Sequence, residues 1–403
     1  MVETLTFILA GGRGKRLYPL TKDRAKPAVP FGGVYRIIDF TLSNCVNSGL
    51  KHIFLLTQYK SYVLEKHISA GWNIYSAELG EFISLLPPQQ RMSEDWYLGT
   101  ADAVRQNIYS IQEMSPEYVF VLSGDHVYEL DYRRMLRFHR RREADATIGL
   151  YQVPLKQATR FGVMAVDEEH RVTGFEEKPA SPKHKPGDPS KSLVSMGVYL
   201  FSTEALVAAL MVDAEDPESS HDFGRDVIPR MIGGYKVFGY PYEDDGKAVR
   251  PYWRDVGTIE DYYEANMDLV SPTPKFNIHD PRWPIRTRAR PDPPAKTVHN
   301  DAKRKRVGLA LNSLLCNGVV VSGARVERSV LGPRVRVNSY SKVEDAVLFS
   351  GVEVGRHCRI KRAIVDKWVK VPPRTRIGYD EDEDRKRFFV SDSGIVVVRK
   401  DAW

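Results

Sequence analysis

Short apolar runs alternate with helix-like segments over the first two thirds of the chain. The strand-like runs occupy residues 4–9, 52–57, 118–122, 146–151, 162–166, 195–201 and 236–240. Apolar residues between 101 and 111 recur at helical spacing behind Thr100, which we expect to be a helix N-cap. Strands that alternate with helices are typical of a mainly parallel sheet in an α/β domain. The pattern predicts such a domain over residues 1–270.

The last quarter of the chain has a different pattern, in which small apolar residues recur six positions apart. The series are Ala324 and Val330; Val337 and Val343; Val352, Cys358 and Ile364; Val354 and Ile360; and Val365, Val371 and Ile377. A period of six with very short straight segments is typical of a parallel β-helix, whose coils each bury small side chains on the next. We expect a β-helix domain over residues 307–403, with an ordinary β-sandwich of accidental spacing as the alternative.

A proline-rich segment separates these two regions. Residues 271–306 contain seven prolines, which leave little room for a helix or a central strand. The segment also carries Phe276, Ile278, Trp283 and Ile285, so we expect a linker that packs against the domains. A length of 403 residues fits two domains joined in this way.

Composition narrows the classes of function. The chain has 59 basic and 52 acidic residues, a modest excess of +7. Basic residues gather at 137–142, 282–290 and 303–306, where a solvated face or a site for an anionic metabolite is favoured over nucleic acid. There is no apolar run of about 18 residues, so we expect no membrane span. The first strand begins within five residues without a basic segment before it, and the three cysteines are scattered. We therefore expect a cytoplasmic protein with reduced thiols.

The first strand-like run breaks into a glycine-rich turn flanked by cations. Gly11, Gly12 and Gly14 fall within four positions, with Arg16 just after them and Lys26 further along. Glycines let backbone N–H groups curl around a phosphate, and Arg and Lys neutralise its charge. The spacing fits neither G-x-G-x-x-G nor a Walker A loop. We interpret the turn as a site for a nucleoside triphosphate, with a plain tight turn as the alternative.

Two aspartates follow strand-like runs and could hold a metal ion. Asp125 follows the run at 118–122, and Asp255 ends a short apolar segment before a helix-like stretch that begins at Ile259. Ligands of an open parallel sheet bind beyond the carboxyl ends of its strands. Paired carboxylates suit Mg²⁺, which is often shared with substrate phosphates. For each aspartate, capping of a helix N-terminus is the alternative.

Further polar residues stand at the ends of other segments. Glu177 and Lys178 precede a proline stop, where the lysine could take a phosphate and the carboxylate could accept sugar hydroxyls. Gln89 and Gln90 lie in a region rich in amides and aromatics before a helix. Such residues suit a nucleobase edge or a hexose face, and loop packing is the alternative.

Together these segments resemble the ADP-glucose pyrophosphorylases, also called glucose-1-phosphate adenylyltransferases, of bacterial glycogen and plant starch synthesis. The resemblance runs essentially end to end and rests on residues 9–17, 24–33, 36–40, 96–103, 123–126, 177–179, 195–197 and 253–258. It implies a Rossmann-like (GT-A-like) nucleotidyltransferase domain followed by a left-handed parallel β-helix of hexapeptide repeats. It also implies that ATP and α-glucose 1-phosphate are converted to ADP-glucose and pyrophosphate.

The same resemblance implies roles for individual residues. Asp125 and Asp255 would hold Mg²⁺ as the cofactor, with Asp125 the principal catalytic residue. Arg16 and Lys26 would neutralise the triphosphate and the departing pyrophosphate. The nucleotide-binding set would be Gly11, Gly12, Gly14, Arg16 and Lys26, with Gln89 or Gln90 reading adenine. The pocket for glucose 1-phosphate would comprise Tyr97, Gly162, Glu177, Lys178 and Ser195, with Lys178 on the phosphate.

Members of this family are typically homotetramers regulated by small anionic metabolites bound between the two domains. The candidate effector residues here are Arg24, Arg36, Lys386 and Arg387. Asp23 stands where many relatives activated by sugar bisphosphates carry a Lys or Arg, and Val390 replaces an Arg of the enterobacterial type. We therefore expect bisphosphate activation to be absent or weak, or regulation to be tuned to another effector.

Two alternative functions share this fold. One is the same chemistry with UTP or dTTP, and the other is a regulatory subunit that binds ligands without turnover. The chain keeps Arg16, Lys26 and Lys178 together with both metal carboxylates, which favours a catalytic chain.

Overall fold

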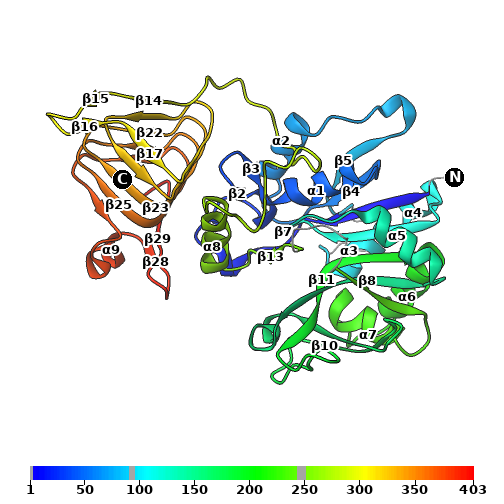
Figure 1. Cartoon of the computed structure of the whole chain (residues 1–403). Helices are drawn as coiled ribbons and strands as arrows, with labels where there is room; N and C mark the ends of the chain where they lie inside the picture. Colours follow the sequence, from blue (N-terminus) through cyan, green and yellow to red (C-terminus); the bar gives the residue numbers. More distant parts are fainter. Residues whose placement is uncertain (1–2, 90–95, 243–250) are drawn as a thin grey trace.

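The computed structural model describes residues 3–89, 96–242 and 251–403, and it shows a domain built on a sheet beside a β-helix (Figure 1). The sheet has nine strands in the described residues, in the order β10-β9-β11-β6-β1-β4-β5, with β8 pairing with both β11 and β12. The strands are β1 (Thr4–Leu9), β4 (His52–Leu56), β5 (Phe82–Leu86), β6 (Tyr118–Ser123), β8 (Ala146–Pro154), β9 (Gly162–Val166), β10 (Val172–Glu177), β11 (Lys191–Ser202) and β12 (Val237–Pro241). All seven strand-like runs of the sequence fall on these strands, and β5 and β10 are additional.

The sheet is mixed, with a parallel centre. Strands β6, β1, β4 and β5 pair in parallel with one another, in that order. Strand β11 runs antiparallel to β6, β8 and β9. The parallel centre matters for function, because the carboxyl ends of β1, β4 and β6 meet at one edge.

Alternate side chains of the central strands enter two separate cores, one on each face of the sheet. Phe7 and Val121 belong to one core, and Ile8 and Phe120 to the other. One face is covered by α1 (Ile37–Asn47), α2 (Tyr62–Gly71) and α5 (Tyr132–Arg141), and the other by α3 (Thr100–Arg105), α4 (Ile108–Met114), α6 (Thr203–Ala214) and α7 (Ile228–Met231). Among the described residues, no helix is long and apolar enough to cross a bilayer.

The helix expected behind Thr100 differs from the prediction in two ways. It is divided into α3 and α4, and Gly99 rather than Thr100 is the N-cap of α3. The Thr100 hydroxyl is occupied elsewhere, because it donates to Asp222 at 2.9 Å and accepts from the backbone N–H of Phe223 at 3.0 Å. Tertiary contacts therefore override the local capping preference of threonine.

The C-terminal domain is a left-handed parallel β-helix with three-sided coils. Residues with positive φ mark its corners, as at Arg328, Arg334 and Tyr340, and the next corner is Asp345. Two sides of a coil thus keep the six-residue period and the third is one residue shorter, so that Arg325 pairs in parallel with Lys342 and not with residue 343. The small apolar residues that recur in the sequence are all buried. Parallel pairing rules out the β-sandwich alternative.

The strands of this domain form two ladders. One contains β14 (Lys296–Val298), β19 (Val320–Ser322), β22 (Arg336–Val337), β24 (Glu353–Val354) and β26 (Lys370–Val371). The other contains β17 (Leu309–Leu311), β18 (Leu314–Leu315), β20 (Arg325–Glu327), β21 (Val330–Leu331), β23 (Lys342–Leu348), β25 (Arg359–Val365), β27 (Arg376–Ile377), β28 (Phe389–Val390) and β29 (Val396–Val398). Shorter pieces are β15 (Asn300–Asp301), β16 (Arg306–Val307) and α9 (Glu381–Arg387).

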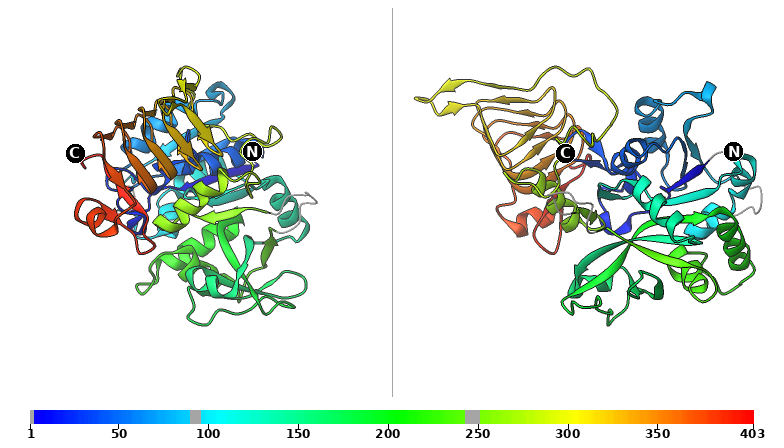
Figure 2. Two further views of the ribbon diagram at one scale, coloured as in Figure 1. Left: turned by 60° about the vertical axis from the view of Figure 1, so that its left-hand side comes forward. Right: turned by 45° about the vertical axis from the view of Figure 1, so that its right-hand side comes forward.

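A third core joins the two domains. Helix α8 (Ile259–Leu269) lies between the sheet and the β-helix (Figures 1 and 2) and contributes Tyr262 to this core, together with Phe31, Phe276 and Phe349. The proline-rich segment packs against the first domain, since Phe276 is buried and the Trp283 indole N–H donates to Asn44 at 2.9 Å. The β-helix boundary expected at residue 307 is too late, because β14 lies within this segment and pairs in parallel with β19 of the β-helix. The smaller elements β2 (Pro30–Phe31), β3 (Tyr35–Arg36), β7 (His126–Tyr128) and β13 (Trp253–Asp255) complete the first domain.

A buried ion pair crosses the same interface. Two contacts, at 3.0 and 2.8 Å, join Arg24 Nη2 to the carboxylate oxygens of Asp366, and both side chains are almost fully buried. A second interdomain pair, Lys22 with Asp401 at 2.7 Å, is about half exposed. Buried and exposed ion pairs differ greatly in what their disruption costs.

We predict that Asp366→Asn destabilises the protein by about 3 kcal/mol, because it leaves the Arg24 guanidinium buried without its counter-charge. Asp401→Asn removes a carboxylate from the same interface, but its effect on stability should be much smaller because that pair is solvated. Urea unfolding followed by tryptophan fluorescence measures both. Equal losses in the two variants would contradict the difference that burial implies.

Candidate active site

A cavity of about 530 Å³ opens at the carboxyl ends of three neighbouring parallel strands. Leu9, Leu56 and Ser123 are the last residues of β1, β4 and β6, and all three line it. Open α/β sheets bind their ligands at this position. The glycine-rich turn after β1 and the loop before α3 supply much of the remaining wall.

The glycine-rich turn brings bare backbone to the cavity. Gly11, Gly12 and Gly14 all line it. A Cβ on Gly12 would meet no atom within 4 Å, so its backbone is open to a ligand. Gly14 has a φ of +59°, and a Cβ there would stand 2.9 Å from the Cβ of Lys26. Only glycine fits that position without strain, so the turn and Lys26 can approach closely.

Lys26 bridges the two predicted metal carboxylates. Its Nζ lies 2.9 Å from Asp125 Oδ2 and 2.8 Å from Asp255 Oδ1, and the lysine is 5% exposed. Burial works against its charge, but the two carboxylates outweigh burial and raise the pKa of Lys26. Arg16 approaches from the solvent side, with its Nη2 3.7 Å from Asp255 Oδ2. The predicted phosphate-binding cations, Arg16 and Lys26, and the predicted metal carboxylates therefore lie in one contiguous cluster.

Neither aspartate caps a helix. Asp125 is followed by strand β7, and α8 after Asp255 is capped by Thr258, which accepts from the backbone N–H of Asp261. Burial acts to raise the pKa of Asp255, but Lys26 and His126 outweigh it and lower the pKa to about 2. The pKa of Asp125 is lowered by the same neighbours against the effect of burial. Both side chains are therefore carboxylates at neutral pH.

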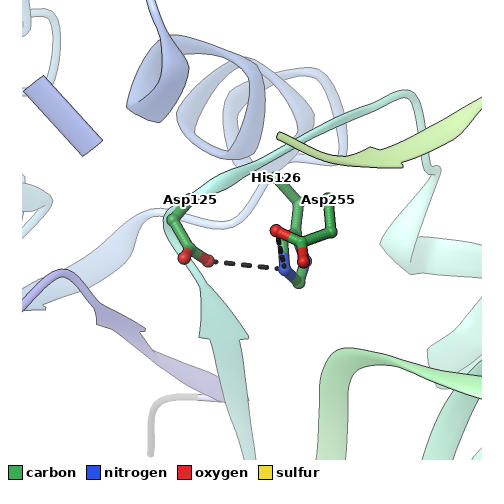
Figure 3. Close-up of side chains that lie close together, drawn as sticks. All are labelled: Asp125, His126 and Asp255. Atoms are coloured by element: carbon green, nitrogen blue, oxygen red, sulfur yellow. Dashed lines mark ion pairs between the residues drawn. The ribbon is translucent and has the colours of Figure 1, made fainter. Parts of the chain in front are cut away.

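His126 completes a group of three potential metal ligands (Figure 3). Asp125, His126 and Asp255 each offer one ligand atom, and these atoms lie within 4.8 Å of one another. The Nδ1 of His126 lies 3.1 Å from the carbonyl oxygen of Met196. A carbonyl only accepts, so Nδ1 carries the hydrogen, and Nε2 faces Asp125 Oδ1 at 3.5 Å and Asp255 Oδ1 at 3.8 Å.

This donor set fits a divalent cation. Two carboxylates and one imidazole nitrogen are common ligands of such ions, and carboxylates suit Mg²⁺ best. The ammonium group of Lys26 now lies against the same two carboxylates. A metal ion bound by both aspartates would therefore compete with Lys26 for them.

Only one of the residues predicted for a sugar phosphate lines this cavity, and the other four, Gly162, Glu177, Lys178 and Ser195, lie on or beside β9, β10 and β11 outside its lining. Tyr97 lines the cavity directly. A Cβ on Gly162 would stand 2.9 Å from Glu177 Oε2, so this glycine leaves room for the carboxylate. Lys178 pairs with Glu177 and is half exposed. Ser195 begins a bulge of β11 and accepts from the backbone N–H of Gly197 at 3.2 Å, and Met196 of the same bulge orients His126.

Sequence reasoning missed Asp222, which also lines the cavity. One oxygen of its carboxylate accepts from the Gly224 and Arg225 N–H groups, and the other accepts from Thr100. A Cβ on Gly224 would lie 3.3 Å from both Asp222 Oδ1 and Glu177 Oε2, so the two carboxylates flank one glycine. The sequence feature that could have pointed to Asp222 is the His-Asp-Phe-Gly run at residues 221–224. Gln58 also lines the cavity and was not singled out, and so does Ser123, to which the run at 123–126 gave no role of its own.

The glutamines proposed for adenine have different outcomes. The Gln89 side chain is turned onto its own loop, where Nε2 donates to the carbonyl oxygen of Pro87 at 2.8 Å, and it does not line the cavity. Gln90 lies outside the described residues. The reading of adenine by either residue stays a prediction.

The candidate effector residues fall into two places. Arg24 and Arg36 lie together at the domain interface, where burial and the nearby Arg24 charge lower the pKa of Arg36 to about 10. Lys386 and Arg387 lie on α9, where Lys386 pairs with Glu383 at 2.5 Å. Arg387 stacks over Phe388. Arg387 also lies over the Trp403 ring, so among the described residues the contacts of this pair are with α9 and the C-terminal residues and not with Arg24 or Arg36.

Comparison with known proteins agrees with this geometry. Residues 5–271 match the family described as nucleotidyl transferase, and residues 293–398 match the GlmU-like C-terminal hexapeptide family. A glucose-1-phosphate adenylyltransferase of Koribacter versatilis is 54% identical over 403 residues, covering 100% of this chain and 96% of the relative. Relatives of the same description from Rhodopirellula baltica and Methylococcus capsulatus are 52% and 51% identical, covering 99% of this chain and 90% and 94% of their own lengths.

The first domain is that of a nucleotidyl transferase, as the family match over residues 5–271 shows. Within that class, the chain belongs to the glucose-1-phosphate adenylyltransferase family, because the similarity to those relatives extends over its whole length.

We predict that Lys26→Met binds Mn²⁺ about tenfold more tightly than the wild type when no nucleotide is present, a gain of about 1.4 kcal/mol. The substitution removes the ammonium group that now neutralises Asp125 and Asp255, so a divalent cation becomes their main counter-charge. Isothermal titration with Mn²⁺ measures the affinity. Lys15→Met is the matched control, since Lys15 lines the cavity but is exposed. Unchanged or weaker binding in Lys26→Met would show that Lys26 does not compete for the site.

Proposed function

We propose that this chain transfers the adenylyl group of ATP to α-D-glucose 1-phosphate, giving ADP-glucose and diphosphate. The observation that supports it most is the bridge from Lys26 to Asp125 and Asp255 beside an open glycine turn. That arrangement puts cations and metal-binding carboxylates where a triphosphate would lie at the strand ends. The names of the full-length relatives support the same substrates.

The reaction needs positioning more than proton transfer. A phosphate oxygen of glucose 1-phosphate forms a bond to the α-phosphorus of ATP, and the bond from that phosphorus to the bridging oxygen of the β-phosphate breaks. Diphosphate leaves with the electron pair. A phosphate monoester is largely dianionic at neutral pH, so the nucleophile needs no general base. The barrier is lowered by holding the two anions in line and by neutralising charge.

In this proposal, the glycine-rich turn and the cations beside it bind the nucleotide. The open backbone of Gly12 lets N–H groups approach phosphate oxygens, as in other anion-binding turns. Arg16 is more than half exposed and lies at the mouth of the cavity, so it can move onto the departing diphosphate. Lys26 is held in place by its two carboxylates. It would turn its charge to the phosphates when a metal ion replaces it there.

In this proposal, the sugar is bound by carboxylates that accept hydrogen bonds from its hydroxyl groups. Glu177 and Asp222 flank Gly224 near the cavity, and the bulge at Ser195 adds a hydroxyl. Lys178 adjoins Glu177 and is exposed enough to reach a phosphate. When bound by Asp125 and Asp255, Mg²⁺ would supply positive charge to the phosphate oxygens as a Lewis acid.

We also infer regulation by a small anion at the domain interface. The Nη1 of Arg24 is buried without a hydrogen-bond partner among the described residues. Lys367 lies nearby, and burial together with Arg36 and Arg24 lowers its pKa to about 7. Such an excess of positive charge would be relieved by an anion. Asp23 lies 3.9 Å from Lys400 and offsets part of that charge, which supports weak binding of a bisphosphate.

We also propose that the chain assembles as a homotetramer. The β-helix presents flat outer faces, and Leu311, Tyr340, Trp368 and Phe389 expose apolar surface on this domain. Exposed apolar groups suit packing between subunits. Light scattering on the purified chain measures the assembly, and a monomer would remove this part of the proposal.

We predict that the purified chain releases diphosphate only when ATP, Mg²⁺ and glucose 1-phosphate are all present, and that Asp125→Asn lowers this rate at least about a hundredfold. Asp382→Asn on the exposed surface of α9 should keep full activity. Coupled detection of diphosphate gives the rates, with UTP and dTTP tested at equal concentration. Preference for another nucleotide would replace ATP in the proposal, and no turnover with any of them would indicate a regulatory subunit.

The same assay tests regulation. Phosphate, fructose 6-phosphate and fructose 1,6-bisphosphate are titrated into the reaction, and we expect the bisphosphate to activate less than about twofold. Strong activation by the bisphosphate would overturn the inference drawn from Asp23 and Val390.

A further inference from the structure

An ion pair joins the segment before β9 to helix α8, which follows Asp255 in the chain. Arg160 and Asp261 form a bidentate pair, in which Nη1 donates to Oδ1 at 3.2 Å and Nη2 donates to Oδ2. The Arg160 side chain is 39% exposed and that of Asp261 is 18% exposed. The two residues are about a hundred positions apart in the chain. Neither is part of the cluster formed by Lys26 and its carboxylates.

Arg160 lies next to the residues proposed to bind glucose 1-phosphate. It ends the 3-10 segment η4 (Leu155–Arg160), and β9 begins two residues later at Gly162. Gly162 stands directly against the Glu177 carboxylate, and the Lys178 N–H donates to the carbonyl oxygen of Phe161 at 3.0 Å. A shift of Arg160 therefore moves the backbone that positions both residues proposed to hold glucose 1-phosphate.

Asp261 lies close in the chain to Asp255, one of the two proposed metal ligands. It lies in the first turn of α8, and Thr258, the N-cap of that helix, donates to Asp261 Oδ2 at 2.8 Å. Asp255 is only a few residues upstream, at the end of β13. A Cβ on the intervening Gly257 would lie 2.9 Å from the Asp255 carboxylate, so this connection is short and closely packed.

Helix α8 is also held by other parts of the molecule. The Tyr263 hydroxyl donates to the carbonyl oxygen of Asp345, and the Ser393 hydroxyl donates to Glu260 at 3.3 Å, both across to the β-helix. The Tyr262 hydroxyl donates to the carbonyl oxygen of Pro30. The helix is thus a fixed reference between the domains (Figure 1), whereas the η4 turn meets it through Arg160.

We propose that the Arg160–Asp261 pair is a positioning latch that sets the sugar-phosphate pocket at the correct distance from Asp255. The proposal rests on the proposed function, since it takes Gly162, Glu177 and Lys178 as the sugar side. The latch adds little to global stability, because an ion pair this exposed contributes little to the free energy of folding. Its effect is geometric, since a bidentate guanidinium–carboxylate pair fixes both distance and orientation. Small misplacements of a bound reactant are costly to a transfer reaction.

The test uses Arg160→Gln, Asp261→Asn and the double variant of the full-length chain. Asparagine can still accept from Thr258, so Asp261→Asn keeps the helix cap while removing the charge. Glu264→Gln is the matched control, because Glu264 is exposed on the same helix. Steady-state kinetics gives KM for each substrate separately, and thermal unfolding reports any general destabilisation.

We predict that each single variant raises the KM for glucose 1-phosphate about fivefold to tenfold, while the KM for ATP stays within about twofold. The double variant should be no worse than either single one, because the pair acts as a unit. The midpoint of thermal unfolding should match the wild type in all of these variants. The control Glu264→Gln should also have the kinetics of the wild type.

Three results would overturn the latch: an unchanged KM for glucose 1-phosphate, parallel changes in both KM values, or additive effects in the double variant. Failure of the proposed function is a separate outcome, because it would be seen first as a wild-type chain without turnover.

Discussion

The contact of one buried ammonium group with two carboxylates organises the active site. Lys26 touches Asp125 from the end of β6 and Asp255 from the end of β13, segments far apart in the chain. Without the lysine, two ionised carboxylates would face each other and His126 in a partly buried place, which is unfavourable. Gly14 permits the approach, since any side chain there would collide with Lys26. The glycine turn, the cation and the two carboxylates therefore depend on one another geometrically.

Helix α8 connects the site to the C-terminal domain. Asp255 leads directly into α8, and α8 is packed into the core that the two domains share. A nucleotidyl transferase domain needs no β-helix to bind a triphosphate at its strand ends, but here the strand bearing Asp255 is followed by a helix that touches both domains. Arg24, buried against Asp366, fixes the same interface. Any anion that alters the charge around Arg24 would act close to elements that hold the active site.

Much of the fold could be predicted from the sequence, because local patterns encode it. The run at 4–9 and its glycine turn form β1 and the cavity wall, and the six-residue series form the β-helix. Local patterns could not show that one side of each coil has five residues, since corners depend on backbone conformation at residues such as Asp345. They also could not show that Thr100 leaves the cap position to bind Asp222. The contact of Lys26 with Asp255 and the role of Met196 in orienting His126 depend on residues brought together only by folding.

The most direct test of this account is a crystal structure of the chain with Mn²⁺ and a non-hydrolysable ATP analogue, with the metal located by anomalous scattering. The account predicts Mn²⁺ bound by the carboxylates of Asp125 and Asp255, and the Nζ of Lys26 moved from them to a phosphate oxygen. A structure in which Lys26 still bridges both aspartates, with the metal bound elsewhere, would contradict the claim that this bridge marks the metal site.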